Sequence, residues 1–266
     1  MKIGLALSGG AARGIAHIGV LKYLEEQNVK PCCIAGTSAG SIVGAMYCSG
    51  KTINELEDAA RNISWKELVK FSVPKQGLIK SSRLLNVLKG YIGAIDFSDL
   101  EIPLLVNAVD LLQGEEVILK KGPVAEAVHA SCAIPGIFTP VKLGDYLLVD
   151  GGLLDNVPVT VMDKFDLDYI IAVDVGAQKP LQKEPNNIFE VLMQSFDIIR
   201  RQRDIPAHEN ADLIIEPDLE DIMLWDVGKA QEIIERGYQA AREALKDINL
   251  KKKQGKISKW FNKRKK

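Results

Sequence analysis

Residues 32–48 read Cys-Cys-Ile-Ala-Gly-Thr-Ser-Ala-Gly-Ser-Ile-Val-Gly-Ala-Met-Tyr-Cys. The first four are small or apolar and predict a short buried strand, and residues 41–47 predict a helix packed closely on the sheet. Between them lies G-x-S-x-G, a pattern typical of a serine exposed on a sharp strand-to-helix turn. Gly36 and Gly40 would let the strand and the helix approach closely, and the helix N-terminus behind Ser38 would favour negative charge. We therefore expect Ser38 to be a nucleophile.

A similar strand–turn–helix unit precedes this one. Residues 2–7 predict a buried strand, and residues 15–27 carry apolar side chains at helical spacing. Two such units in succession indicate an α/β fold with a mostly parallel central sheet and helices on both faces. Further along, the sequence predicts hairpins over 103–119 and 143–150, strands over 169–174 and 213–215, and helices over 52–93 (broken at Pro74 and Gly77), 123–130, 188–199 and 229–245.

A glycine-rich run, Ser8-Gly9-Gly10-Ala11-Ala12-Arg13-Gly14, follows the first strand. It fits neither the dinucleotide-binding pattern nor the P-loop, because Ala11 replaces the second glycine and no Gly-Lys-Ser/Thr follows. Consecutive backbone N–H groups in such a turn can instead point at one oxygen and form an oxyanion hole. We expect that loop to consist of Gly9, Gly10, Ala11, Arg13 and Gly14. The Arg13 side chain would orient the loop, meet an anionic head group or form an ion pair at the helix start.

Two aspartates compete as the proton acceptor for Ser38. Asp150 ends a predicted strand and is followed by Gly151 and Gly152, so its carboxylate can face a site, and Asp174 ends another strand. The residues alone leave both open. The chain has three histidines, His17, His129 and His208. His129 is expected to be structural and His208 to be exposed. His17, which lies nearest the glycine loop, is expected to pack or to form a hydrogen bond, and it could also shuttle a proton.

Three motifs occur in order along the chain, at residues 9–14, 36–40 and 150–152. Together they resemble the patatin-like phospholipase family, whose members are lipid acyl hydrolases with a Ser–Asp dyad. Residues 130–136 and 138–140 resemble the segment that precedes the aspartate in this family. The resemblance covers about residues 5–163 and is greatest to compact bacterial members. It implies a patatin-like α/β/α hydrolase fold, a Ser38–Asp150 dyad, and supporting roles for Gly36, Gly40, Gly151 and Gly152. Ala11 departs from the pattern, because alanine disfavours the positive φ that a glycine would permit there.

The resemblance implies a serine esterase of the phospholipase A or lysophospholipase type, acting on a lipid or fatty-acyl ester without metal or cofactor. Asp150 would accept the Ser38 proton, and the N–H groups of Gly10, Ala11 and Ala39 would stabilise the oxyanion that leads to an acyl-enzyme. Two alternatives remain. An acyltransferase or thioesterase would use the same dyad with another acceptor, and a lipid-binding or regulatory protein would keep the fold without catalysis.

The composition predicts one domain and a separate tail. The chain has 266 residues, 47% of them hydrophobic, which suits a single domain over residues 1–249. Nine of its 34 Lys and Arg residues lie in 251–266, a segment without Asp or Glu. The rest of the chain has 25 basic residues against 35 acidic ones, so it is acidic whereas the tail is basic. Ile257, Trp260 and Phe261 would share one face of a helix, so 250–266 predicts an amphipathic tail on anionic membrane. A solvated basic tail is the alternative, and nucleic acid is disfavoured.

The remaining features concern location and access to the site. No apolar run is long enough for a transmembrane helix, and the start of the chain does not resemble a signal peptide. The four cysteines, Cys32, Cys33, Cys48 and Cys132, lack metal-binding spacing and are expected to be buried or half-buried thiols. We expect a cytoplasmic protein that touches the inner membrane face through its tail. Residues 71–95 mix apolar and basic groups and predict either a mobile cover or an ordinary amphipathic helix.

Overall fold

The structure is a computed structural model that describes residues 1–63, 82–176, 184–185, 188–203, 205–246 and 248. The tail 250–266 and residues 71–81 of the expected cover lie outside the described residues, so both expectations stay predictions. The strands are β1 (Ile3–Leu7), β2 (Cys33–Gly36), β3 (Leu104–Asp110), β4 (Glu115–Leu119), β5 (Val141–Leu143), β6 (Tyr146–Asp150), β7 (Tyr169–Val173) and β8 (Leu213–Ile215). The α-helices are α1 (Ala16–Glu26), α2 (Ala39–Cys48), α3 (Ile53–Asn62), α5 (Ser82–Ile92), α6 (Val124–Ser131), α7 (Ile188–Arg203), α8 (Ile205–Asn210) and α9 (Ala230–Leu245).

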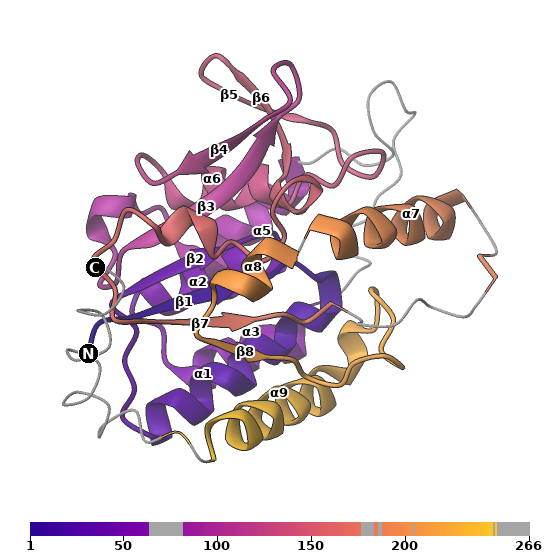
Figure 1. Ribbon diagram of the computed structural model, residues 1–266. Coiled ribbons are helices and arrows are strands. Elements are labelled where there is room, and N and C mark those ends of the chain that lie inside the picture. Colours follow the sequence, from indigo (N-terminus) through magenta and orange to yellow (C-terminus); the bar gives the residue numbers. More distant parts are fainter. Residues whose placement is uncertain (64–81, 177–183, 186–187, 204, 247, 249–266) are drawn as a thin grey trace, which may run out of the picture.

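The strands form one 8-stranded sheet in the order β5-β6-β3-β2-β1-β7-β8, with β4 also paired to β3 (Figure 1). The neighbours from β3 through β2, β1 and β7 to β8 are parallel, whereas β4, β5 and β6 pair antiparallel. The predicted α/β class with a mostly parallel central sheet is therefore confirmed. Both predicted hairpins are present, as β3–β4 and β5–β6.

Side chains alternate between the two faces of the sheet, as a strand requires. Leu5 and Leu7 of β1 point into the larger core, which α1, α2, α3 and α9 help to build. Ala6 lies on the other face, in a smaller core with Met162 and Ala207. The small side chains on this second face allow the segment after β6 and helix α8 to pack close to the sheet.

Strand β3 determines where β2 and β6 end relative to each other. Val106 pairs with Gly36 of β2 and with Leu119 of β4, so β2 and β4 lie on opposite edges of β3. Ala108 pairs with β4 and with Asp150 of β6, which places β6 on the same edge as β2. Strands β2 and β6 therefore meet end to end along one edge of β3. The turns that follow Gly36 and Asp150 start from neighbouring positions.

The C-terminal part of the described chain packs on its beginning. Helix α9 lies along α1 (Figure 1), and two glycines stand where the helices touch. A Cβ on Gly19 would come within 1.9 Å of the Ile234 carbonyl oxygen, and one on Gly237 within 2.0 Å of the Ala16 carbonyl oxygen. No larger side chain fits such a contact without moving the backbone, so α9 is held close to the helix that follows the glycine loop.

One expectation about the cysteines was wrong. Cys33, Cys48 and Cys132 are buried, but Cys32 is exposed. Cys32 directly precedes β2, where alternation turns its side chain away from the core that receives Cys33. Among the described residues, no helix is long and apolar enough to cross a bilayer.

Candidate active site

Ser38 occupies the turn between β2 and α2 with a backbone conformation that is unfavourable for serine, φ 48° and ψ −120°. Such strain costs roughly 1–3 kcal/mol and persists only where the surroundings enforce it. The flanking glycines explain how the turn closes. A Cβ on Gly40 would lie 2.2 Å from the Leu7 carbonyl oxygen, and one on Gly36 would lie 2.7 Å from the Ser41 Cα. The turn therefore requires glycine at both positions.

Two buried serines hold the strained backbone of Ser38. The Ser38 N–H donates to Ser131 Oγ at 2.8 Å, and Ser41 Oγ donates to the Ser38 carbonyl oxygen at 2.6 Å. Both partner side chains are fully buried. Sequence reasoning did not single out these two residues. The signal for Ser131 was its place in the segment before the aspartate, but only the fold brings it to Ser38.

Asp150 ends β6 and lies beside Ser38 in one pocket. Its Oδ1 accepts a hydrogen bond from the Gly152 N–H at 2.8 Å. Burial raises the pKa of Asp150 to about 6, and hydrogen bonds from the Ser38 hydroxyl and the Gly152 N–H lower it by a smaller amount. A carboxylate that titrates so close to neutrality is suited to accept and return a proton.

Asn107 of β3 joins the two turns that carry Ser38 and Asp150. Its Oδ1 accepts a hydrogen bond from Thr37 Oγ1 at 2.6 Å, and its Nδ2 donates to the Asp155 carbonyl oxygen at 2.7 Å. A Cβ on Gly151 would lie 2.4 Å from the same Oδ1. Gly151 therefore permits a polar side chain from the central sheet to reach both turns. A Cβ on Gly152 would meet its neighbours at 3.0 Å or more, a milder restriction.

The glycine loop after β1 faces Ser38, and only part of its N–H groups are engaged. Gly9 donates to the Asn156 carbonyl oxygen at 3.2 Å, and Arg13 donates to the Gly10 carbonyl oxygen at 3.0 Å. Within the described part of the chain, the N–H groups of Gly10, Ala11 and Ala39 have no backbone acceptor. Three such donors around a nucleophile can bind a developing oxyanion.

Ala11 adopts a φ of 49° despite its side chain. The sequence departs from a glycine pattern at this residue, yet the backbone keeps the left-handed conformation that a glycine would adopt more easily. Ala11 and Ser38 are thus two strained residues bordering one pocket. At the end of the loop, a Cβ on Gly14 would lie 2.4 Å from the Ala39 Cβ, so the close approach of the loop to α2 requires glycine there.

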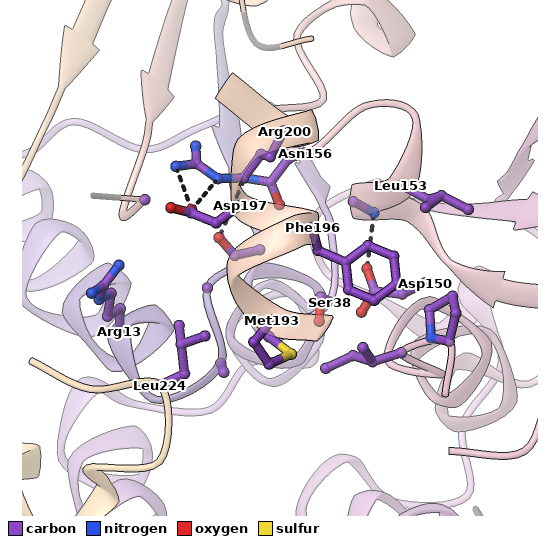
Figure 2. A pocket seen from close by; sticks show the side chains of 17 residues that line it. Arg13, Ser38, Asp150, Leu153, Asn156, Met193, Phe196, Asp197, Arg200 and Leu224 are labelled. Carbon is purple, nitrogen blue, oxygen red and sulfur yellow. Dashed lines mark hydrogen bonds and ion pairs between the residues drawn. The ribbon is translucent and has the colours of Figure 1, made fainter. Parts of the chain in front are cut away.

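The Arg13 side chain is buried and braces the loop from the side. Its Nε donates to the Ile222 carbonyl oxygen at 2.8 Å, and the N–H of Ala12 donates to the Leu224 carbonyl oxygen at 3.0 Å. Burial lowers the pKa of Arg13. Figure 2 shows Arg13 and Asp150 on opposite sides of the pocket. These contacts tie Arg13 to the segment around residues 222–224, and its loop-orienting role stays a prediction.

The other residues considered as proton acceptors or proton shuttles have different surroundings. Asp174 is buried after β7, where its Oδ1 accepts from the Gly176 N–H at 2.8 Å and lies 3.5 Å from Arg200 Nη1. His17 is fully buried with Nε2 2.8 Å from the Ser8 carbonyl oxygen, and burial lowers its pKa to about 4, so it is neutral and supports the turn after β1. His129 is buried in α6, and the side chain of His208 lies outside the described residues.

The pocket at Asp150, called here the Asp150 pocket, has a volume of about 100 Å³. Helix α7 crosses it and contributes Met193, Phe196, Asp197 and Arg200 (Figure 2). The sequence left residues 71–95 open between a mobile cover and an ordinary amphipathic helix, and residues 71–81 lie outside the described part of the chain. The described part of that segment forms α5, which borders a different cavity. Among the described residues, no group of His, Cys, Asp and Glu side chains is placed to hold a metal ion.

Residues 5–163 match the sequence model of the family described as patatin-like phospholipase. An NTE family protein of Mycobacterium tuberculosis is 30% identical over 269 residues, covering 91% of this chain and 46% of the relative. The lysophospholipase NTE1 of Candida albicans is 30% identical over 214 residues, covering 78% of this chain and 15% of the relative. The chain thus spans less than half the length of these curated relatives.

Solved structures of low sequence identity share the fold. VipD from Legionella pneumophila superposes with a TM-score of 0.67 at 13% identity, covering 92% of this chain and 66% of that one. ExoU from Pseudomonas aeruginosa, solved in complex with SpcU, gives a TM-score of 0.52 at 16% identity, covering 92% of this chain and 52% of that one. At such identities the likeness concerns the fold alone.

Replacing Ser131 with alanine tests whether its hydroxyl positions Ser38. The substitution leaves the buried Ser38 N–H without an acceptor, so we expect a loss of about 1–3 kcal/mol in the free energy of unfolding. Because the strained turn loses one of its two restraints, kcat on a chromogenic ester should fall at least about tenfold with KM nearly unchanged. Ser49→Ala, which removes a hydrogen bond from Ser49 Oγ to the Met46 carbonyl oxygen at the far end of α2, is the control. An unchanged kcat in Ser131→Ala would refute the positioning role.

The raised pKa of Asp150 predicts a pH-dependent gain in stability from Asp150→Asn. The folded protein holds this proton more tightly than the unfolded chain, so the stability that the group contributes is complete below pH 3.8 and is lost as pH rises through about 6. At pH 8 the asparagine variant should be more stable by roughly 3 kcal/mol, and at pH 5 by roughly half as much. Urea unfolding at both pH values measures this, with Asp145→Asn in the exposed β5–β6 turn as control. Equal stability of Asp150→Asn and the wild type at pH 8 would contradict the buried, charged carboxylate.

Proposed function

Because the chain belongs to the patatin-like phospholipase family, we propose that it is a serine ester hydrolase that acts on lipid acyl esters. Ser38 is the nucleophile and Asp150 is the proton acceptor. The observation that carries the proposal is the meeting, around Ser38, of a strained backbone, a carboxylate with a pKa of about 6 and three N–H groups that have no backbone acceptor among the described residues. The family membership and the lysophospholipase NTE1 relative support a lipid substrate.

The reaction proceeds in two steps. Asp150 takes the Ser38 hydroxyl proton as Oγ attacks the ester carbonyl carbon, and the N–H groups of Gly10, Ala11 and Ala39 stabilise the oxyanion. The bond from carbon to the alcohol oxygen then breaks, and Asp150 returns the proton to the leaving alkoxide. In the second step Asp150 deprotonates a water that attacks the acyl-enzyme. The bond from the carbonyl carbon to Ser38 Oγ then breaks, and Asp150 gives the proton to Oγ, which releases the acid and restores Ser38. Each N–H donor is worth about 3–4 kcal/mol in comparable enzymes.

Ser38 and Asp150 form a base–nucleophile pair without histidine. An exposed aspartate has a pKa near 3.9, which makes it a weak base at neutral pH. Burial at the end of β6 moves the pKa of Asp150 to about 6, which brings it nearer to the value that general base catalysis favours. His17, neutral and bonded to the Ser8 carbonyl oxygen, is not needed for this step.

Purified Ser38→Ala and Asp150→Asn variants test the proposal on p-nitrophenyl acetate, on a medium-chain p-nitrophenyl ester and on a lysophospholipid. Ser38→Ala should reduce hydrolysis to background. Asp150→Asn should lower kcat by about 10²–10⁴-fold, because a positioned general base contributes that much. Ser49→Ala and Asp145→Asn should retain the wild-type rate. Full activity in either dyad variant would refute the assignment.

The same assay separates the two rival functions. An acyltransferase would form more ester than acid when glycerol is added as a competing acceptor, whereas a hydrolase releases acid. A lipid-binding protein without catalysis would leave all three esters intact in the wild type while remaining folded.

A further inference from the structure

Ser38 borders a second cavity of about 140 Å³, called here the apolar cavity, which lies among α1, α2, α3 and α5. Ala11 and Ile134 also border both cavities, so the two volumes meet at the nucleophile. None of the described residues around the apolar cavity carries a charge. The Asp150 pocket, by contrast, includes Arg13, Asp197 and Arg200. Ser38 thus stands between a cavity without charged residues and a pocket that holds charged side chains among apolar ones.

We propose that the apolar cavity binds the acyl chain of the substrate, while the Asp150 pocket receives the alcohol part; this inference rests on the proposed function. A carbonyl carbon attacked by Ser38 Oγ carries an oxyanion, an acyl chain and a leaving alkoxide, which point in different directions. The N–H groups of Gly10 and Ala11 take the oxyanion. The leaving alkoxide must lie near Asp150, which returns its proton. The acyl chain therefore enters the remaining space, the apolar cavity.

The volume of the apolar cavity sets the length of chain it encloses. An apolar cavity of about 150 Å³ in another protein stays dry and binds benzene, which has six carbon atoms. At about 140 Å³, the cavity here encloses a similar number. With the carbonyl carbon outside it at Ser38, roughly the first six to eight carbon atoms of an acyl chain fit inside the cavity. Burial of each methylene favours binding by about 0.8 kcal/mol, so selectivity for such chains over acetate follows.

Helix α3 contributes the residues that limit the chain. Leu56, Ala59 and Ala60 line the apolar cavity, and Ala60 is almost fully buried there. A leucine at position 59 or 60 adds three carbon atoms toward this space and displaces about as many methylenes of a bound chain. Asn54 lies on the exposed side of the same helix, so a leucine there adds the same group outside the cavity.

The test compares p-nitrophenyl octanoate with p-nitrophenyl acetate in the wild type, Ala60→Leu, Ala59→Leu and the control Asn54→Leu. We expect the octanoate-to-acetate ratio of kcat/KM to fall roughly 50-fold in Ala60→Leu, the equivalent of three lost methylene contacts. Ala59→Leu, at a half-buried position that tolerates the larger side chain more easily, should lower the ratio in the same direction. Asn54→Leu should leave the hydrolysis of both esters within about twofold of the wild type, because position 54 lies outside the cavity. A ratio unchanged in both alanine variants overturns the proposal.

A binding measurement separates this proposal from the proposed function. Octanoate is titrated calorimetrically into Ser38→Ala, with and without Ala60→Leu, so that no turnover is needed. We expect octanoate to bind and Ala60→Leu to weaken it by a similar factor. Equal affinity with and without Ala60→Leu, or no binding to Ser38→Ala, overturns the acyl assignment even if esters are hydrolysed. If octanoate binds and Ala60→Leu weakens its binding, but the wild type hydrolyses no ester, then the proposed function is refuted and the acyl-binding cavity is not.

Discussion

The site depends on the end-to-end meeting of β2 and β6 along one edge of β3. Hydrogen-bond register fixes Gly36 opposite Val106 and Asp150 opposite Ala108, so the turns that carry Ser38 and Asp150 leave the sheet side by side. Asn107, between these two register positions, binds the side chain of Thr37 and packs against Gly151. A slip of one residue in either strand would turn its side chains to the other face and separate the pair.

Around this junction the fold holds a strained backbone at Ser38 and a buried carboxylate at Asp150, and hydrogen bonds support both. Ser38 is strained, and the hydroxyls of Ser131 and Ser41 bind its N–H and carbonyl groups. Asp150 is buried, which raises its pKa, and the Gly152 N–H supports its carboxylate. Strain and desolvation of this kind persist only where the surrounding structure is rigid. The parallel sheet behind the two turns, buried on both faces, supplies that rigidity.

Local patterns were sufficient to predict the sheet-based fold and the two turns, because periodicity and glycine placement act over a few residues. G-x-S-x-G between an apolar run and a small-residue run predicted the strand–turn–helix unit that β2 and α2 form. Contacts between distant segments could not be predicted in this way. Ser131 reaches Ser38 from 93 residues away, and α7 reaches the Asp150 pocket from the C-terminal part of the chain. Cys32 shows the same limit, since one step in strand alternation decides its exposure.

The most direct measurement is mass spectrometric peptide mapping of the protein after reaction with a fluorophosphonate, which labels activated serines covalently. We expect a single adduct on Ser38, a labelling rate that falls as pH is lowered through about 6, and slow labelling in Asp150→Asn. The absence of an adduct, or an adduct on another serine, would contradict the claim that the junction of β2 and β6 makes Ser38 a nucleophile.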